Sequence, residues 1–129
     1  MAQTYPVYVV DDDPTMRDWV EILCEEKNLD CRGFADGAGL LEAVGTLASG
    51  CILLDMRMPG RTGLQVQQEL GSRGVTMPVV AITGYGDVDM AVQSMRLGAL
   101  DFLEKPFPSE VLFEALERAF KRLEETQAS

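Results

Sequence analysis

The chain has 129 residues, which is the size of one ordinary domain with a single sizeable core. Hydrophobic residues make up 47% of the sequence and charged residues 25%, as in a folded globular domain. The net charge of −10 disfavours direct binding to nucleic acid, whose phosphate backbone would repel this chain. Because the sequence has no histidine, it cannot form a serine-histidine triad, a histidine zinc site or a phosphohistidine, and any chemistry must use carboxylates, lysine, hydroxyl groups or a metal ion.

Apolar runs and cysteines carry information about the compartment. No apolar run approaches the roughly 18 residues of a membrane-spanning helix, and the N-terminus lacks a basic segment followed by an apolar one. Cys24, Cys31 and Cys51 lie in apolar surroundings without C-x-x-C spacing, so they are expected to be small buried side chains in a reducing environment. We therefore expect a cytoplasmic protein that makes no membrane contact.

In the first half of the chain, apolar segments of strand length alternate with segments of helical period. Strands are predicted over residues 5–10, 31–35 and 51–54, the second of them with the weakest pattern. A first helix is predicted to begin at Pro14 after an aspartate cap, since proline suits the first turn of a helix. A second helix is predicted from its apolar positions, which are Leu40, Leu41, Val44 and Leu47.

The second half continues the alternation. A helix is predicted over residues 63–73, a strand over 78–82, a helix capped by Asp87, and a short strand over 101–103 that Lys105 and Pro106 close. The last helix has the most regular apolar stripe, from Val111 to Leu123. No repeat, linker or second domain is evident, so residues 1–129 are expected to form one domain.

Five strand-helix units predict an α/β fold. Nearly continuous apolar strands indicate a parallel sheet with helices on both faces. Right-handed crossovers favour a flavodoxin-like, doubly wound sheet of five strands in the order 2-1-3-4-5 with five helices. In such sheets, ligands bind beyond the carboxyl ends of the strands.

Polar side chains occur where that rule places a site. Asp11 and Asp12 follow the first predicted strand, Asp55 the third, Thr83 the fourth and Lys105 the fifth. Taken one at a time, the aspartates after the first strand would cap a helix, Asp55 and Thr83 would be ordinary polar residues at strand ends, and Lys105 would be a surface charge. Their joint occurrence at four strand ends favours a functional site instead. Three converging carboxylates would repel one another unless a cation lay among them. A hard divalent ion such as Mg²⁺ suits an all-oxygen ligand set.

Four segments resemble the signature motifs of one family. They are Val-Asp-Asp-Asp-Pro at 10–14, Leu-Leu-Asp-Met-Arg-Met-Pro at 53–59, Ile-Thr-Gly at 82–84 and Glu-Lys-Pro-Phe at 104–107. In order and spacing they resemble the receiver domains of bacterial two-component response regulators, over roughly residues 5–123. The stretch 83–107 is most similar to FixJ-type receivers and next to NtrC-type receivers.

The resemblance implies a phosphoryl-accepting site. Asp55 would take a phosphoryl group from a sensor histidine kinase. Asp12, Asp55 and the backbone carbonyl of Arg57 would bind Mg²⁺ directly, and Asp11 would act mainly through water. Lys105 would pair with the phosphoryl oxygens. The chain would catalyse its own phosphoryl transfer and dephosphorylation, and otherwise would not be an enzyme.

The resemblance also implies a switch and an output. Thr83 would donate its hydroxyl to the phosphoryl group, and Phe102 would change rotamer when Thr83 moves, unless it is simply a core aromatic. The face of the fourth helix, fifth strand and fifth helix would then mediate homodimerisation. On this face the fourth helix carries Asp89, Gln93 and Arg96 beside apolar Met90 and Leu97, a mix that suits a weak and reversible contact. FixJ-type proteins continue into a DNA-binding domain, so a C-terminal output domain is expected to follow this receiver in the natural protein. In that case the chain is an excised receiver. The alternative is a receiver that functions alone. Tyr85 is a departure, because many relatives have a smaller residue or a histidine there, and it is expected to alter the phosphoryl lifetime.

The residues after the fifth strand support one further structural prediction. The peptide bond between Lys105 and Pro106 is expected to be cis, although only about 5% of such bonds are. A sharp reversal is needed there to turn Lys105 into the site, and the resemblance implies the same.

Two alternatives remain at this point. Asp11, Asp13 and Thr15 match the nucleophile motif of haloacid-dehalogenase-type phosphatases, which would make Asp11 the nucleophile and leave Asp55 without a role. A non-catalytic receiver that only binds partners is the other alternative, although every expected site residue is present.

Overall fold

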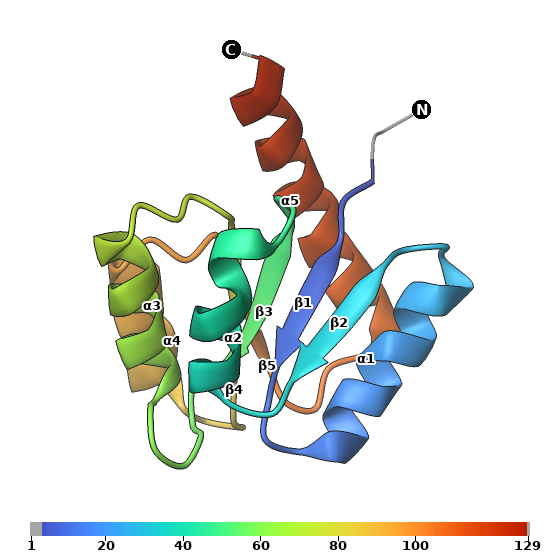
Figure 1. Ribbon diagram of the computed structural model, residues 1–129. Helices are drawn as coiled ribbons and strands as arrows, with labels where there is room; N and C mark the ends of the chain where they lie inside the picture. The colour runs from blue at the N-terminus through green and yellow to red at the C-terminus, as the bar shows by residue number, and fades with distance from the viewer. Residues whose placement is uncertain (1–3, 129) are drawn as a thin grey trace.

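The computed structural model describes residues 4–128, which form a central sheet with helices on both faces (Figure 1). Five parallel strands lie in the order β2-β1-β3-β4-β5. The strands are β1 (Val7–Val10), β2 (Cys31–Phe34), β3 (Cys51–Asp55), β4 (Val79–Thr83) and β5 (Asp101–Glu104). The helices are α1 (Pro14–Glu26), α2 (Gly37–Ala43), α3 (Gly63–Ser72), α4 (Val88–Arg96) and α5 (Ser109–Ala128), with a 3₁₀ turn η1 (Val44–Thr46) after α2. The predicted flavodoxin-like, doubly wound fold with strand order 2-1-3-4-5 is confirmed.

The sheet separates two hydrophobic cores, because successive strand residues point to opposite faces. Val7 and Val9 of β1 pack in a core with α1 and α5. Tyr8 and Val10 pack in a core with α2 and α3. All four residues of β1 are buried, which explains why its sequence is a continuous apolar run.

Three strands extend one residue further toward the carboxyl edge than their apolar patterns predict. β3 ends at Asp55, β4 at Thr83 and β5 at Glu104. Asp55 is in register with Ile82, and Thr83 with Glu104. Ladder hydrogen bonds use the backbone and do not require an apolar side chain. The polar residues at the strand ends are therefore held in the sheet itself.

At their amino ends, two strands begin later than predicted, and in both cases a proline precedes the strand. β1 begins at Val7 after Pro6, and β4 begins at Val79 after Pro78. Proline has no backbone N–H to donate to a ladder, so it stays at the end of a strand.

The helix ends follow the sequence in most places. Asp13 caps α1 by accepting from the Thr15 amide at 2.9 Å, and Pro14 begins the helix, as predicted. The prediction of a single helix reaching Leu47 is wrong, because α2 ends at Ala43 and a 3₁₀ turn follows. Gly45 lies in that turn, and glycine weakens helix propagation.

Three smaller predictions also have outcomes. Cys24 and Cys51 are fully buried, as expected, whereas Cys31 begins the edge strand β2 and is only partly buried. The peptide bond between Lys105 and Pro106 is cis, which confirms the prediction. Within residues 4–128, no helix combines the length and apolarity needed to cross a membrane.

Candidate functional site

The predicted polar residues meet at the carboxyl edge of the parallel sheet, where the arrows of β1, β2 and β3 end in Figure 1. Asp11 follows β1, Asp55 ends β3, Thr83 ends β4 and Lys105 follows β5. Asp11, Asp55 and Thr83 are buried, with exposed fractions of 0%, 5% and 2%. The exposed Asp12 lies beside them at the rim. The sheet thus assembles residues that are up to 94 positions apart, from Asp11 to Lys105.

Three of these residues form an acidic cluster. Asp11, Asp12 and Asp55 each place one carboxylate oxygen within 4.8 Å of the others. Lys105 faces the cluster, with its Nζ 3.0 Å from Oδ2 of Asp11 and 3.8 Å from Oδ2 of Asp55. One lysine therefore opposes three carboxylates, and the cluster keeps a negative excess.

This environment shifts the proton affinity of Asp55. Burial raises its pKa to about 7, and the negative charge of Asp11 adds to the rise. The Lys105 ammonium and the Arg57 amide, which donates to Oδ1 of Asp55 at 3.2 Å, act in the opposite direction. For Lys105, burial acts to lower the pKa, but the carboxylates of Asp11 and Asp55 outweigh burial and raise it. An additional cation at the cluster would relieve the same repulsion.

The donor set fits a hard metal ion. All three side chains offer carboxylate oxygens, which suit Mg²⁺ or Ca²⁺ better than a soft metal. Asp11 is oriented by its neighbours, since its Oδ1 accepts from the Asp13 amide at 2.9 Å and its backbone carbonyl accepts from Arg17 at 2.7 Å. The cluster is therefore an acidic pocket that could bind a metal.

The Thr83 hydroxyl contacts the neighbouring strand. It points to the carbonyl of Leu103 in that strand, at a long 3.5 Å. The side chain of Phe102, next to Leu103, is 44% exposed. The alternative that Phe102 is a core aromatic is therefore wrong. Phe102 and Thr83 line a hollow of about 370 Å³ against α4, so the predicted switch residues are neighbours.

The predicted role of Asp87 as a helix cap needs correction. Asp87 occupies the N-cap position of α4, but its side chain makes no capping hydrogen bond. Its Oδ2 instead accepts from Nε of Arg57 at 2.6 Å. Sequence reasoning considered only the carbonyl of Arg57 and missed this ion pair. The two residues are 30 positions apart, and no local pattern links them.

Gly63, the first residue of α3, is a second feature that sequence reasoning missed. A Cβ at this position would lie 2.5 Å from the carbonyl oxygen of Asp55 and 2.7 Å from Cα of Met56. The Gly63 amide donates to the Met56 carbonyl at 3.0 Å. Only a glycine lets α3 approach the end of β3 so closely. The glycine eight residues after Asp55 was the available signal.

Gly84 and Tyr85 follow Thr83 directly in the chain, after the end of β4. Tyr85 is 86% exposed, so its ring is available at the surface near Thr83. A Cβ at Gly84 would meet open space, so a larger residue there would extend into solvent without meeting the fold. The effect of Tyr85 on phosphoryl lifetime stays a prediction.

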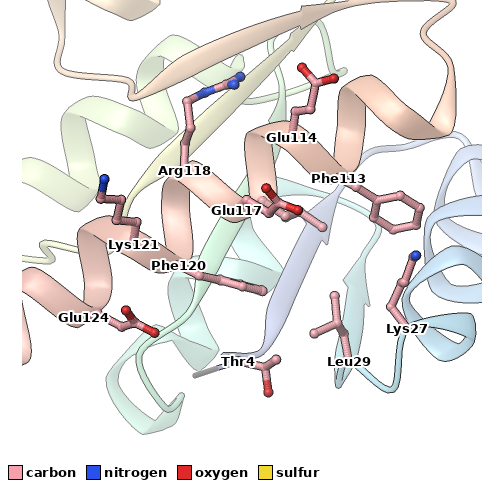
Figure 2. A pocket seen from close by; sticks show the side chains of 11 residues that line it. Thr4, Lys27, Leu29, Phe113, Glu114, Glu117, Arg118, Phe120, Lys121 and Glu124 are labelled. Atoms are coloured by element: carbon pink, nitrogen blue, oxygen red, sulfur yellow. The ribbon is translucent and has the colours of Figure 1, made fainter. Parts of the chain in front are cut away.

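A larger hollow, of about 700 Å³, lies along α5 beside the end of α1 (Figure 2). Phe113, Phe120 and Leu29 surround it, and the Lys27 ammonium lies 5.0 Å from the centre of the Phe113 ring. None of the strand-end residues lines this hollow. The acidic cluster and this hollow are therefore separate features of the domain.

Comparison with known proteins agrees with the geometry. The family model described as "Response regulator receiver domain" matches residues 7–117. The transcriptional regulatory protein FixJ of Azorhizobium caulinodans is 42% identical over 122 residues, which cover 95% of this chain and 58% of the relative. The crystal structure of FixJ-N has a TM-score of 0.88 at 34% identity and covers 92% of this chain and 95% of that one. Full-length FixJ from B. japonicum has a TM-score of 0.90 at 36% identity and covers 98% of this chain and 63% of that one.

The chain therefore spans about three fifths of the length of its full-length FixJ relatives. The similarity extends over nearly all of this chain and includes the strand-end cluster. This chain belongs to the response regulator receiver domain family.

Proposed function

We propose that Asp55 accepts a phosphoryl group from a sensor histidine kinase and that this charge switches the domain. The observation that carries the proposal is the position of Asp55 in the acidic cluster, where its carboxylate lies close to those of Asp11 and Asp12 and 3.8 Å from the Lys105 ammonium. A carboxylate is a weak nucleophile, so the rate of phosphoryl transfer depends on positioning and on neutralised charge.

Each residue of the cluster has a role in this reaction. An oxygen of Asp55 attacks phosphorus as the bond to the donor breaks, and the leaving group takes up a proton. Lys105 neutralises charge on the phosphoryl oxygens, because its Nζ is already within 3.8 Å of Asp55. Asp12, Asp55 and the carbonyl of Arg57 would hold Mg²⁺ directly, and Asp11 through water. When bound, Mg²⁺ supplies positive charge to the transferring group.

The same residues support dephosphorylation. Water attacks the phosphorus of the acyl phosphate, the bond from phosphorus to the Asp55 oxygen breaks, and inorganic phosphate leaves, so the domain ends its own signal. Tyr85 is proposed to slow or admit that water, because it is exposed and lies two residues after Thr83 in the chain. The domain is regulatory, and this self-directed chemistry is the only catalysis that we propose for it.

The switch is proposed to pass from Thr83 to Phe102. The Thr83 hydroxyl now points to Leu103, and a phosphoryl group on Asp55 would draw it toward the site. The space that it leaves lies in the hollow shared with Phe102, which can then rotate inward. A change of charge becomes a change of shape on the face formed by α4, β5 and α5, which we propose as the dimerisation surface.

The partners follow from charge and from the relatives. With a net charge of −10, this domain is not expected to contact nucleic acid itself. The FixJ relatives are longer, so we propose that a C-terminal DNA-binding domain accompanies this receiver in the full protein. We propose a cytoplasmic location, where the domain could meet both the sensor kinase and the DNA that the output domain would bind.

The phosphatase alternative, with Asp11 as nucleophile, is less well supported by the geometry. Asp11 is fully buried, its Oδ1 accepts from the Asp13 amide, and its Oδ2 pairs with Lys105. Asp55 would then have no role, although its carboxylate is central to the cluster. A non-catalytic receiver is disfavoured because every residue of the reaction is present and close together.

Mass spectrometry after treatment with acetyl phosphate tests the proposal. The wild-type chain should gain one phosphoryl group that depends on Mg²⁺ and is lost in alkali, as an acyl phosphate is. Asp55→Asn should abolish this label, while Asp11→Asn should weaken it. Labelling of Asp55→Asn at the wild-type level would overturn the assignment, and loss only in Asp11→Asn would support the phosphatase reading.

A further inference from the structure

The loop between β4 and α4 is attached to the rest of the site by two charged side chains. The Gly86 amide donates to Oε2 of Glu104 at 3.0 Å, which joins the loop to the end of β5. Asp87 pairs with Arg57 at 2.6 Å, which joins it to the segment after β3. Arg57 is two residues beyond Asp55, and its amide donates to Oδ1 of Asp55 at 3.2 Å, so this second attachment starts next to the carboxylate of Asp55.

Because Asp87 pairs with Arg57, the first turn of α4 lacks a side-chain cap. An aspartate at an N-cap normally accepts a hydrogen bond from the second or third amide of its helix. Asp13 does so in α1 and Asp36 in α2, at 2.9 and 2.8 Å. Asp87 does not, and its backbone (φ −88°, ψ 63°) lies outside the extended conformation of those two caps. The carboxylate that would cap α4 is committed to Arg57.

Buried contacts of α4 come from the middle and second half of the helix. Of its nine described residues, Ala91 and Ser94 are buried. The Ser94 hydroxyl donates to Oε1 of Gln67 in α3 at 2.5 Å, and the Gln67 amide donates back to the Ser94 carbonyl at 3.2 Å. This buried bridge anchors the second half of α4, whereas the first turn depends on how Asp87 is engaged.

We propose that Arg57 and Asp87 form a latch that keeps α4 uncapped until Asp55 is phosphorylated. The inference rests on the proposed function of Asp55. The Arg57 amide lies 3.2 Å from Oδ1 of Asp55, and the side chain is 70% exposed, so the guanidinium is free to turn toward the site. A phosphoryl group carries about −2 charges, which makes it a stronger partner for a guanidinium than one carboxylate is. Once Arg57 turns, Asp87 caps the amide of Asp89 or Met90.

The latch acts directly on the output face. Val88, the first residue of α4, is 63% exposed and lines the same hollow as Thr83 and Phe102. Fixing the first turn of α4 therefore changes one wall of the space into which Phe102 rotates. Arg57 is a positioning residue in the proposed latch, because it acts on α4 through Asp87.

Hydrogen exchange at the amides of Asp89 and Met90, measured by NMR in the unphosphorylated protein, tests the latch. Arg57→Gln frees Asp87 to cap and should raise protection roughly fivefold, the effect of one N-cap. The double variant Arg57→Gln/Asp87→Ala should lose this gain. Arg57→Lys keeps an ion pair and should resemble wild type. Arg96→Gln, which removes a positive charge from the other end of α4, is the matched control and should leave both amides unchanged.

The activated state gives a second measurement. Beryllofluoride, which mimics a phosphoryl group, should raise protection of these amides in wild type but add little in Arg57→Gln. Equal protection in unphosphorylated wild type and Arg57→Gln would overturn the latch, whatever happens at Asp55. Absence of a Mg²⁺-dependent phosphoryl label on Asp55 would instead refute the proposed function, so the two failures are distinguishable.

Discussion

The carboxyl group of Asp55 favours its protonated form in the folded, metal-free domain, because burial raises its pKa from 3.8 to about 7. In the unfolded chain this group is ionised above about pH 4. Between about pH 4 and pH 7 the folded state therefore binds one more proton than the unfolded state. By linkage, this group's contribution to stability is complete below about pH 4 and is lost as the pH rises through 7.

Asp55→Asn should consequently stabilise the metal-free domain at pH 8 and stabilise it much less, by about a third as much, at pH 5. The gain is on the order of 2 kcal/mol, about half of what the full rise in pKa would give, because solvent reaches the site. Urea unfolding with a chelator present, at both pH values, measures it. Addition of Mg²⁺ at pH 8 should stabilise wild type more than the variant. An equal gain at pH 5 and pH 8 would show that the charge of Asp55 is not the cause.

Asp11 and Asp12 should differ in their contribution to metal affinity. Asp12 is exposed at the rim and is the proposed direct ligand, whereas Asp11 already pairs with Lys105 and accepts from the Asp13 amide. Asp12→Ala should therefore weaken Mg²⁺ binding by about tenfold or more, and Asp11→Ala by less. Calorimetric titration with Mg²⁺ measures both, and equal losses would remove the distinction between the two carboxylates.

At the scale of the elements, the start of α3 controls the backbone that carries Asp55. Gly63→Ala places a Cβ 2.5 Å from the Asp55 carbonyl, a clash with backbone that should cost about 1–3 kcal/mol of folding free energy. Gly71→Ala in the same helix meets open space and should stabilise by about 0.5–1 kcal/mol. Chemical denaturation of both variants makes the comparison. A neutral Gly63→Ala would mean that α3 can move away from β3 without cost.

The bridge between α3 and α4 should be important for stability as well as for position. Ser94→Ala leaves Oε1 of the buried Gln67 without its donor, which should cost about 1–3 kcal/mol. Replacing both partners, with Ser94→Ala and Gln67→Leu, should cost less than the single change, since no polar group is then left unsatisfied. Additive losses in a double-mutant cycle would show that the two side chains are not coupled.

For the whole molecule, the exposed apolar residues mark the expected dimer surface. The sequence predicted Met90 and Leu97 on this face, but Met90 packs against the core and only Leu97 is exposed, at 44%. Val88, Val92 and Met95 of α4 are exposed instead, at 63%, 42% and 41%. Together with Phe102 they form an apolar patch among charged neighbours, which suits a weak and reversible contact.

Activation should therefore make the domain dimerise. Sedimentation of the beryllofluoride-activated protein at about 100 μM, well above an expected micromolar dissociation constant, should show a dimer, and the untreated protein a monomer. Phe102→Ala should weaken the dimer while Asp55 still accepts the phosphoryl group. An activated protein that stays monomeric at this concentration would exclude the dimer and favour docking to another partner.

Much of the fold and of the site could be predicted from the sequence, because both depend on the spacing of apolar residues and on the order of strands and helices along the chain. Strand-length apolar runs alternating with helical stripes specify a parallel sheet, and the carboxyl ends of parallel strands must share one edge. Asp11, Asp55, Thr83 and Lys105 could thus be brought together before any distance was known. The exact ends of the strands could not be predicted, because Asp55 and Thr83 continue the backbone ladder although their side chains are polar.

Other features were decided only by the tertiary structure, because they depend on distances between segments that no local pattern encodes. The contact of Gly63 with the Asp55 backbone is set by the packing of α3 against β3. Asp87 has the sequence of a helix cap, yet its carboxylate binds Arg57, which the fold places beside it from 30 residues away. A charged partner within reach competes with a local hydrogen bond of similar strength, so the sequence determined where Asp87 stands in the chain and the fold determined what it binds.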